Sequence, residues 1–474
     1  MGILVFRSMV MAAAMLGFAN SQPALAQAVD SERQMGRGQA GSTQADIAAM
    51  ARAVEAERLR ATITHLVGFG TRHTLSDTDS PTRGIGAART WVQREFAAMN
   101  CASPLRLETP AQTFSGERLP QPTQVTNVLA IQRGTADPDR VVVISAHLDS
   151  RVTNPLNATA DAPGANDDGS GVAAVLEAAR VLCGHRFAAT IVYAVLSGEE
   201  QGLFGGKVLA DYATAQHWRV EANLNNDIIG NVTGSSGRTD RSHVRVFSEG
   251  TRSLETPAEA SRRRYNGGEV DSPSRNLARY IDSLAGAYLT NFDVVMIYRT
   301  DRFGRGGDQV RMLEAGFPSV RVTEAQENYD RQHQDVRVEN GVAYGDVLAG
   351  VDFDYLAQVT RLNVIALAHL SRAPAPPTGV DISGAVSADT TVRWTPVPGA
   401  SRYRVWWRNT TDPQWQLVRD VGDVSSVVLN SVIIDDWFFG VQAIGEDGSA
   451  SPIVFPGAPG AFLPVPPPHL STAP

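Results

Sequence analysis

Lysine, cysteine and clustered basic residues are scarce in this sequence. Its 474 residues include one lysine and two cysteines, and the formal net charge is −8. Without a basic run or a positive overall field, the chain lacks the charge features of a nucleic-acid-binding protein. Cys101 and Cys183 are too few for a metal site built from thiolates. Two cysteines can pair in an oxidising compartment, but the sequence leaves that pairing open.

Long apolar runs are also absent. Residues 8–19 form an apolar stretch behind Arg7, and the tripeptide Ala-Leu-Ala at 24–26 matches the small-x-small pattern of signal peptidase sites. This stretch is shorter than the roughly 20 residues that a membrane-spanning helix needs. We therefore predict a signal peptide over 1–26, a flexible segment over 27–44, and a periplasmic or extracellular protein without a membrane span.

Between residues 45 and 372, helical and strand-like hydrophobic patterns alternate. Strands are predicted at 125–132, 141–144, 190–196, 224–228, 244–247, 293–298 and 319–323, with helices at 45–67, 85–99, 170–182, 202–213, 275–289 and 351–371. This alternation predicts an α/β fold with a mixed, mainly parallel sheet flanked by helices. Residues 233–275, rich in Ser, Arg, Gly and Glu around the strand at 244–247, are predicted to form a long surface excursion.

The composition changes at a proline-rich linker over 373–377. Five of the seven tryptophans follow it, within short alternating segments separated by turns. We predict a small all-β sandwich over 378–460 and a proline-rich tail over 461–474. Trp394 on an early strand and the late segment 437–441 resemble a fibronectin type III module. That resemblance implies a spacing or adhesion unit without catalytic residues, with a cell surface or a polymer as its candidate contact.

Acidic and histidine residues gather near the ends of the predicted strands. Because the carboxyl ends of parallel strands meet at one edge of a sheet, these side chains are candidates for one shared metal site. Each motif alone also has an ordinary explanation as a surface pair, a turn, a helix cap or an acidic helix start. The residues are His147 and Asp149, Asp167 and Asp168 in a glycine-flanked turn, Glu199 and Glu200, Asp227, and His333 on a polar loop.

In this chain order, the motifs resemble those of the M28 family of co-catalytic zinc aminopeptidases, and the resemblance covers about residues 45–370. It implies a zinc-exopeptidase-like fold, two zinc ions and peptide hydrolysis. It also implies that the peptide bond after the shared aspartate is cis. The implied ligands are His147 and Asp227 for one zinc, Glu200 and His333 for the other, and Asp167 as the bridge between them.

The resemblance implies that Glu199 is the general base, and simple chemistry agrees. Two metals lower the pKa of a shared water, and a carboxylate that is not a ligand must take its proton and pass it to the leaving amine. Asp149 is expected to hold the ring of His147. Asp308 and Tyr329 are candidates for supporting the site and the tetrahedral intermediate. The segment 306–309 departs from the family, because glutamine replaces the usual histidine after Asp308.

We therefore predict a secreted dizinc aminopeptidase that acts on peptides with a free N-terminus. A carboxypeptidase or dipeptidase with the same metal chemistry is the alternative, with Arg302, Arg305 and Arg311 as candidate clamps for a substrate carboxylate. A related one-zinc cyclase would not need the complete set of five ligands. A non-catalytic binding protein on a peptidase scaffold would be expected to lose ligands or the base, and all six residues are present.

Overall fold

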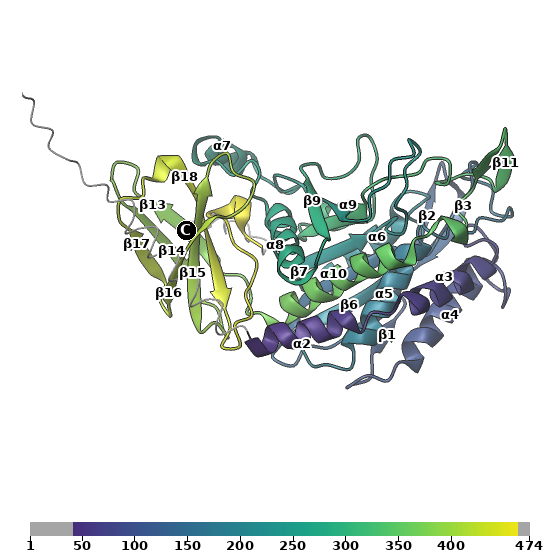
Figure 1. Ribbon diagram of the computed structural model, residues 1–474, viewed down its shortest axis with the longest axis horizontal. Coiled ribbons are helices and arrows are strands. Elements are labelled where there is room, and N and C mark those ends of the chain that lie inside the picture. The colour runs from purple at the N-terminus through teal and green to yellow at the C-terminus, as the bar shows by residue number, and fades with distance from the viewer. Residues whose placement is uncertain (1–40, 463–474) are drawn as a thin grey trace, which may run out of the picture.

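The computed structural model describes residues 41–462. The predicted signal peptide over 1–26, and most of the predicted flexible segment 27–44, lie outside this range. The described chain forms a large part, with helices around a central sheet, and a smaller part made of strands (Figure 1). No helix within the described range is long and apolar enough to cross a membrane.

The central sheet has eight strands in the order β1-β4-β6-β5-β7-β10-β8-β9. Strands β6, β5, β7 and β10 run parallel in the centre, and β8 and β9 are also parallel. The remaining pairings are antiparallel. The predicted mixed, mainly parallel sheet is thus confirmed. The strands are β1 (Arg106–Glu108), β4 (Val128–Gln132), β5 (Asp137–His147), β6 (Ala189–Leu196), β7 (Arg219–Asn226), β8 (His243–Phe247), β9 (Asp293–Ile297) and β10 (Ser319–Glu324).

Helices cover both faces of this sheet and bury separate hydrophobic cores. The larger core involves α2 (Gly41–Arg52), α3 (Ala56–Gly68), α4 (Gly84–Ala98), α5 (Gly169–Leu182), α8 (Pro273–Tyr288) and α10 (Phe353–Arg372). The smaller core involves α6 (Phe204–Ala215) and α9 (Gln309–Glu314).

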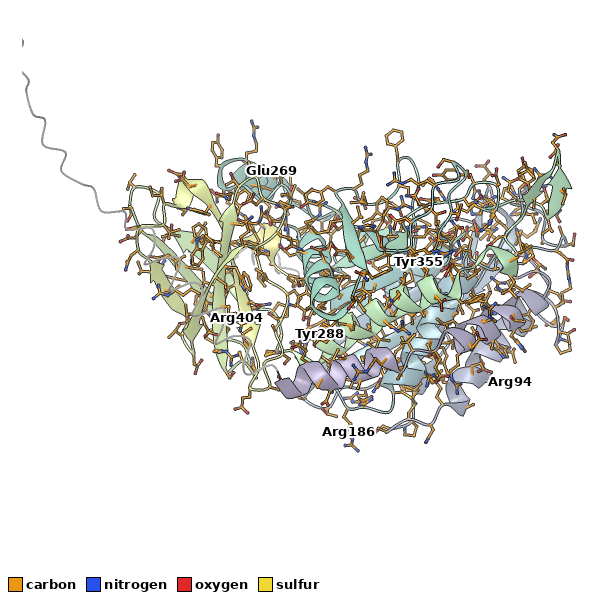
Figure 2. All side chains as sticks on the ribbon, viewed as in Figure 1. Arg94, Arg186, Glu269, Tyr288, Tyr355 and Arg404 are labelled. Atoms are coloured by element: carbon orange, nitrogen blue, oxygen red, sulfur yellow. A yellow bond between two sulfur atoms is a disulfide. The ribbon has the colours of Figure 1, made fainter. Side chains whose placement is uncertain are left out.

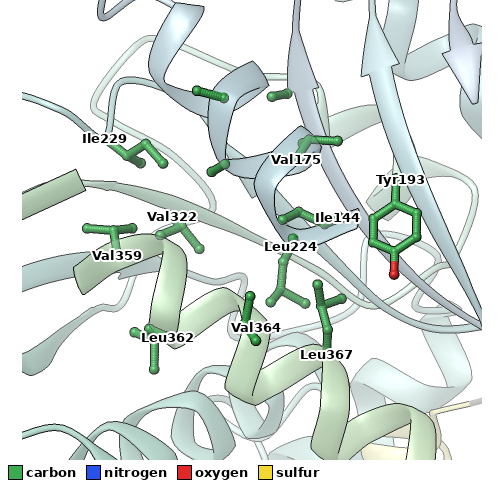
Figure 3. Close-up of a cluster of buried hydrophobic side chains, with 14 of the residues drawn as sticks. Ile144, Val175, Tyr193, Leu224, Ile229, Val322, Val359, Leu362, Val364 and Leu367 are labelled. Carbon is green, nitrogen blue, oxygen red and sulfur yellow. The ribbon is translucent and has the colours of Figure 1, made fainter. Parts of the chain in front are cut away.

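Alternate residues of β5 face these two cores. Val142 and Ile144 belong to the larger core, where Figure 3 shows Ile144 near residues of α10 such as Val364. Val141 and Val143 belong to the smaller core. The continuous apolar run of the sequence therefore reflects a strand that is buried on both faces.

Two predicted elements are each divided in the structure. The helix predicted at 45–67 is interrupted between α2 and α3, where the backbone N–H of Glu55 donates to the carboxylate of Glu177 at 2.8 Å. Helix α2 also begins at Gly41, so the end of the predicted flexible segment is helical.

The strand predicted at 125–132 is divided at Asn127 into β3 (Leu119–Thr126) and β4. Strand β3 forms a hairpin with β2 (Ala111–Gly116), while β4 joins the central sheet. The Asn127 side chain donates to the carbonyl oxygen of Gly205 at 2.9 Å and accepts from the N–H of Ser197 at 3.1 Å. These contacts with distant residues divide a strand whose local pattern is continuous.

Residues 233–275 do not form a surface excursion throughout, and this prediction was wrong in part. Strand β8 lies inside the central sheet between β10 and β9. The hydroxyl of Tyr355 on α10 donates to the carbonyl oxygen of His243 in β8 at 2.8 Å (Figure 2). Within this segment, α7 (Pro257–Asn266) has no buried residue and matches the expectation.

The strands after the linker form two three-stranded antiparallel sheets around one core. This core includes Trp394, Tyr403, Phe439 and also Phe462, so the predicted tail begins later than residue 461. One sheet is β13 (Thr378–Ser383), β14 (Thr390–Thr395) and β17 (Ser426–Leu429), and the other is β16 (Leu417–Gly422), β15 (Arg402–Asn409) and β18 (Trp437–Ile444).

The sandwich is docked on α8 through a buried ion network. Asp271, just before α8, is fully buried and pairs with Arg279 of α8 and with Arg408 of β15, each at 2.8 Å. The indole N–H of Trp415 also donates to Asn276 at 3.1 Å. A single carboxylate thus holds arginines from both parts of the molecule.

The sandwich lies toward the amino ends of the central strands. A cavity of about 1360 Å³ between the two parts is lined by Asp137 at the start of β5, by Arg219 at the start of β7, and by residues of the sandwich. The opposite, carboxyl ends of these strands carry the candidate site described below.

The two cysteines form a disulfide. Cys101 follows α4, and Cys183 lies at the end of α5, so the bond connects two helices that cover the same face of the sheet. The pairing that the sequence left open is therefore present.

Candidate metal centre

Three strand ends and one helix start bring acidic and histidine side chains together at the carboxyl edge of the sheet. His147 is the last residue of β5, and Asp227 follows β7 directly. Glu199 and Glu200 lie on the turn after β6. Asp167 precedes the residue that caps α5, and the peptide bond after it is cis, as the family resemblance implied.

His333 reaches the same place from the loop between β10 and β11 (Arg337–Glu339), which pairs with β12 (Val342–Tyr344). Its Nε2 lies 3.0 Å from Asp167 Oδ2 and 3.0 Å from Glu200 Oε1. The other oxygen of Asp167, Oδ1, lies 3.2 Å from His147 Nε2, which is 3.9 Å from Asp227 Oδ1. The two oxygens of Asp167 therefore face two different histidines.

These donor atoms form two groups, each within 4.8 Å: one from His147, Glu199 and Asp227, the other from Asp167, Glu200 and His333. Two ligands on one tetrahedral zinc lie about 3.3 Å apart, given bond lengths near 2.0–2.2 Å. Glu200 Oε1 is buried and accepts no hydrogen bond, although His333 Nε2 lies 3.0 Å away, and such an oxygen is costly unless a cation satisfies it. The residues present therefore fit a pair of metal ions.

Glu199 belongs to the first group but is less enclosed than Glu200. Burial raises the pKa of the Glu199 carboxyl well above its usual value, and the negative charges of Asp227 and Glu200 raise it further against the opposing charge of His147. A carboxyl group with a raised pKa is suited to taking up a proton and passing it on.

Asp149 supports the site in a different way from the one expected. The Nδ1 of His147 lies 3.0 Å from the backbone carbonyl oxygen of Asp149, whereas the nearest carboxylate oxygen is 3.7 Å away. The carboxylate instead accepts from the backbone N–H of Glu200 at 3.1 Å, from that of Glu199 at 3.3 Å and from Thr74 at 3.0 Å. Its carbonyl orients the histidine, and its carboxylate holds the turn that carries both glutamates.

Two buried residues that the sequence reasoning missed hold the loop around Asp167. Asp346 accepts from the backbone N–H groups of Asn166 and Asp167, the latter at 2.7 Å. The fully buried Arg72 donates to the carbonyl oxygens of Leu148 at 2.7 Å and Gly164 at 2.8 Å. Their partners lie many residues away along the chain, so no local pattern marks these two residues.

Asp308 lies at the start of α9 and is buried, and burial raises its pKa to about 7. Its carboxylate accepts a hydrogen bond from the backbone N–H of Gly206 at 2.7 Å. Asp308 therefore positions the start of α6 and does not contact a candidate ligand through this bond. Gln309, which replaces the usual histidine, donates to Asp301 at 2.6 Å. Neither side chain has a hydrogen bond to a candidate ligand within the described residues.

Tyr329 lies on the loop that carries His333, with 59% of its surface exposed. Its backbone N–H donates to Ser235 at 2.6 Å. No contact of its hydroxyl group within the described range assigns it a role, so its part in catalysis stays a prediction.

The three arginines considered as carboxylate clamps are all engaged in ion pairs. Arg302 pairs with Asp301 at 3.0 Å, Arg305 with Glu327 at 3.0 Å, and Arg311 with Glu314 at 2.8 Å. These pairs leave the carboxypeptidase alternative with less support.

Of the three, Arg302 also reaches a candidate ligand, with its Nη2 4.0 Å from Asp227 Oδ2. Two other arginines contact candidate ligands at shorter distances, and the sequence reasoning missed both. Arg321 in β10 forms an ion pair with Asp227 Oδ2. Arg151 donates its Nε–H to Glu200 Oε2 at 2.8 Å, and its Nη2 lies 2.6 Å from Nδ1 of His333. An arginine between two valines of a buried strand was the one sequence signal for Arg321.

In a comparison with protein families, residues 127–347 match the model of peptidase family M28. A protein of Leptosphaeria maculans, described as a probable zinc metalloprotease, is 43% identical over 417 residues, covering 87% of this chain and 96% of that protein. A protein of Pyrenophora tritici-repentis with the same description is 43% identical over 419 residues, covering 87% of this chain and 86% of its own.

Among solved structures, LapA of Legionella pneumophila is similar in fold, with a TM-score of 0.50 and 19% identity. The similarity covers 69% of this chain and 76% of LapA. It supports the arrangement of the central sheet and its helices.

Proposed function

The chain belongs to peptidase family M28 and is a zinc metalloprotease, and from that premise we propose that it is a dizinc aminopeptidase that releases N-terminal residues from peptides. The observation that carries the proposal is the pair of donor groups joined by Asp167, each of whose oxygens faces a different histidine. A one-metal site would not need an aspartate in that position.

In this proposal, five side chains hold the metals. Bound zinc would supply Lewis acidity and an activated water at neutral pH. The three carboxylates among the ligands would balance most of the charge of two divalent ions. His147 and Asp227 would hold one ion, Glu200 and His333 the other, and Asp167 would bridge both.

Glu199 is the proposed general base. It takes a proton from the attacking water and gives it to the nitrogen of the leaving amine. Its carboxylate lies beside His147 and Asp227 without being needed as a ligand, and Asp149 holds its backbone. These contacts hold Glu199 beside the first donor group.

The choice of the N-terminus as the end that is cleaved rests on charge. The arginines first considered as clamps for a substrate carboxylate already have acidic partners. A carboxypeptidase would need an unpaired guanidinium at the site.

We also propose that residues 1–26 direct the protein to the periplasm or the exterior. The β part over 378–462 is proposed to be a fibronectin type III-like unit that contacts a cell surface or a polymer. Its place at the amino ends of the central strands supports a role away from the substrate.

The test combines one variant with a small panel of peptides. Glu199→Gln should keep wild-type zinc content and lose at least about 100-fold in kcat, as expected for removal of a general base. The wild-type enzyme should cleave peptides with a free N-terminus and leave N-acetylated versions of the same peptides intact. Cleavage of the acetylated peptides from their carboxyl end would favour a carboxypeptidase. A variant within tenfold of wild-type kcat would remove Glu199 from its role.

A further inference from the structure

Asp227 presents its two oxygens to two different surroundings. Oδ1 faces His147 Nε2 at 3.9 Å, whereas Oδ2 is in an ion pair with Arg321 and lies 4.0 Å from Nη2 of Arg302. Arg321 is fully buried in the middle of β10, and its Nη2 also donates to the backbone carbonyl oxygen of Asp227 at 3.3 Å. The guanidinium of Arg321 therefore holds Asp227 at two points, one carboxylate oxygen and the backbone carbonyl oxygen.

The two carboxylate oxygens of Glu200 also have different surroundings. Its Oε1 lies 3.0 Å from His333 Nε2, and its Oε2 accepts from Arg151 Nε at 2.8 Å. The contact of Arg151 with Nδ1 of His333 needs an unprotonated Nδ1, whereas a neutral histidine that binds metal through Nε2 carries its proton there. We therefore expect Arg151 to keep only its contact with Glu200 when metal is bound.

Asp167 differs from both of these carboxylates. Its oxygens lie 3.2 Å and 3.0 Å from the two histidines, and no arginine in the described part of the chain pairs with it. The carboxylate placed between the two groups thus has both oxygens directed at histidines. Asp227 and Glu200, in contrast, each have one oxygen paired with a guanidinium.

We propose that Arg321 is a positioning residue that restricts Asp227 to metal binding through one oxygen, and that Arg151 does the same for Glu200. The proposal rests on the dizinc function proposed above. A carboxylate can bind a metal through one or both oxygens, and a charge-assisted hydrogen bond to one oxygen leaves the other as the donor. One-oxygen binding leaves a coordination position on each metal for water and substrate.

The surroundings of Arg321 hold its guanidinium in place. Asp301 lies 3.8 Å from Arg321 and is itself held by Gln309 at 2.6 Å. Gly307 passes so close that a Cβ atom there would lie 2.7 Å from Nη1 of Arg321. A guanidinium enclosed in this way can set the plane of the Asp227 carboxylate.

The test measures metal binding and needs no activity assay. In Arg321→Met, we expect the zinc affinity of one of the two sites to fall about 10- to 100-fold in competition with a chelator. The visible absorption per Co²⁺ in the cobalt-loaded protein should also fall, because Asp227 is then free to bind through both oxygens and raise the coordination number. Arg321→Lys keeps the charge without the planar fork and should restore only part of both signals.

Arg151→Met applies the same test to Glu200 and to the other site, and it decides the question if Arg321→Met does not fold. Arg305→Met is the matched control, because Arg305 pairs with Glu327 and with no candidate ligand; it should leave affinity and spectrum unchanged. Wild-type affinity and spectrum in both test variants, or a rise in affinity, would overturn the positioning role alone. Fewer than two metals in the wild-type protein would contradict the proposed function as well.

Discussion

His369 on α10 illustrates how a single buried residue sets a response to pH. Its Nε2 lies 2.7 Å from the hydroxyl of Tyr288, a residue of α8 that is labelled in Figure 2. Burial, together with the positive charge of Arg372, lowers the pKa of His369 to about 4. Between pH 6.5 and 4 the unfolded chain therefore binds more protons than the folded chain, so stability is lost as the pH falls.

We expect His369 to account for a loss of about 2 kcal/mol in the free energy of unfolding between pH 7 and pH 5. His369→Gln removes the titrating group and should reduce the pH dependence by that amount. Urea denaturation of both proteins at the two pH values measures it. An equal slope with pH in the variant and the wild-type protein would show that His369 does not titrate in this way.

Some residues of the site could be predicted from the sequence, and others could not. His147 and Asp227 could be predicted as site residues because they follow strands whose patterns are visible in the sequence. The roles of Arg321 and Asp346 could not be predicted, because their partners in the site are 94 and 179 residues away. Asp149 was a candidate from the sequence, but only the structure separates the role of its carbonyl from that of its carboxylate.

At the scale of helices and strands, the hydrophobic pattern of the sequence predicted an element well where its buried residues recur with the helix or strand period. The central strands and α5, α6 and α10 lie within a few residues of their predicted positions. The pattern failed where distant contacts decide the backbone, as at Asn127 between β3 and β4 and at Glu55 before α3. In segment 233–275, short strand β8 is buried only because β10 and β9 enclose it.

On the scale of the whole molecule, buried contacts join the β sandwich to the catalytic part. A unit that served only as a spacer would not need them. The three buried charges of Asp271, Arg279 and Arg408 connect them. Removing one member of such a network leaves the others buried without a partner, which is costly. The two parts are therefore expected to unfold as one cooperative unit.

Asp271→Asn tests this coupling. It should lower the free energy of unfolding by about 3 to 5 kcal/mol, since two buried guanidinium groups lose their anion. Asp420→Asn is the control, because Asp420 pairs with Arg402 at 3.1 Å on the surface of the sandwich, and we expect a cost below about 1 kcal/mol. Chemical denaturation followed by tryptophan fluorescence measures both. Equal costs, or separate transitions for the two parts in the wild-type protein, would contradict the coupling.

The central claim is that Asp167 joins two metal ions in one site, and metal content tests it most directly. Elemental analysis of the purified wild-type protein should find two zinc ions per chain. Asp167→Ala should retain fewer than one, because both donor groups lose a shared ligand, while circular dichroism shows the fold unchanged. Two zinc ions in this variant would contradict the bridging role, and one zinc ion in the wild-type protein would contradict the dizinc site itself.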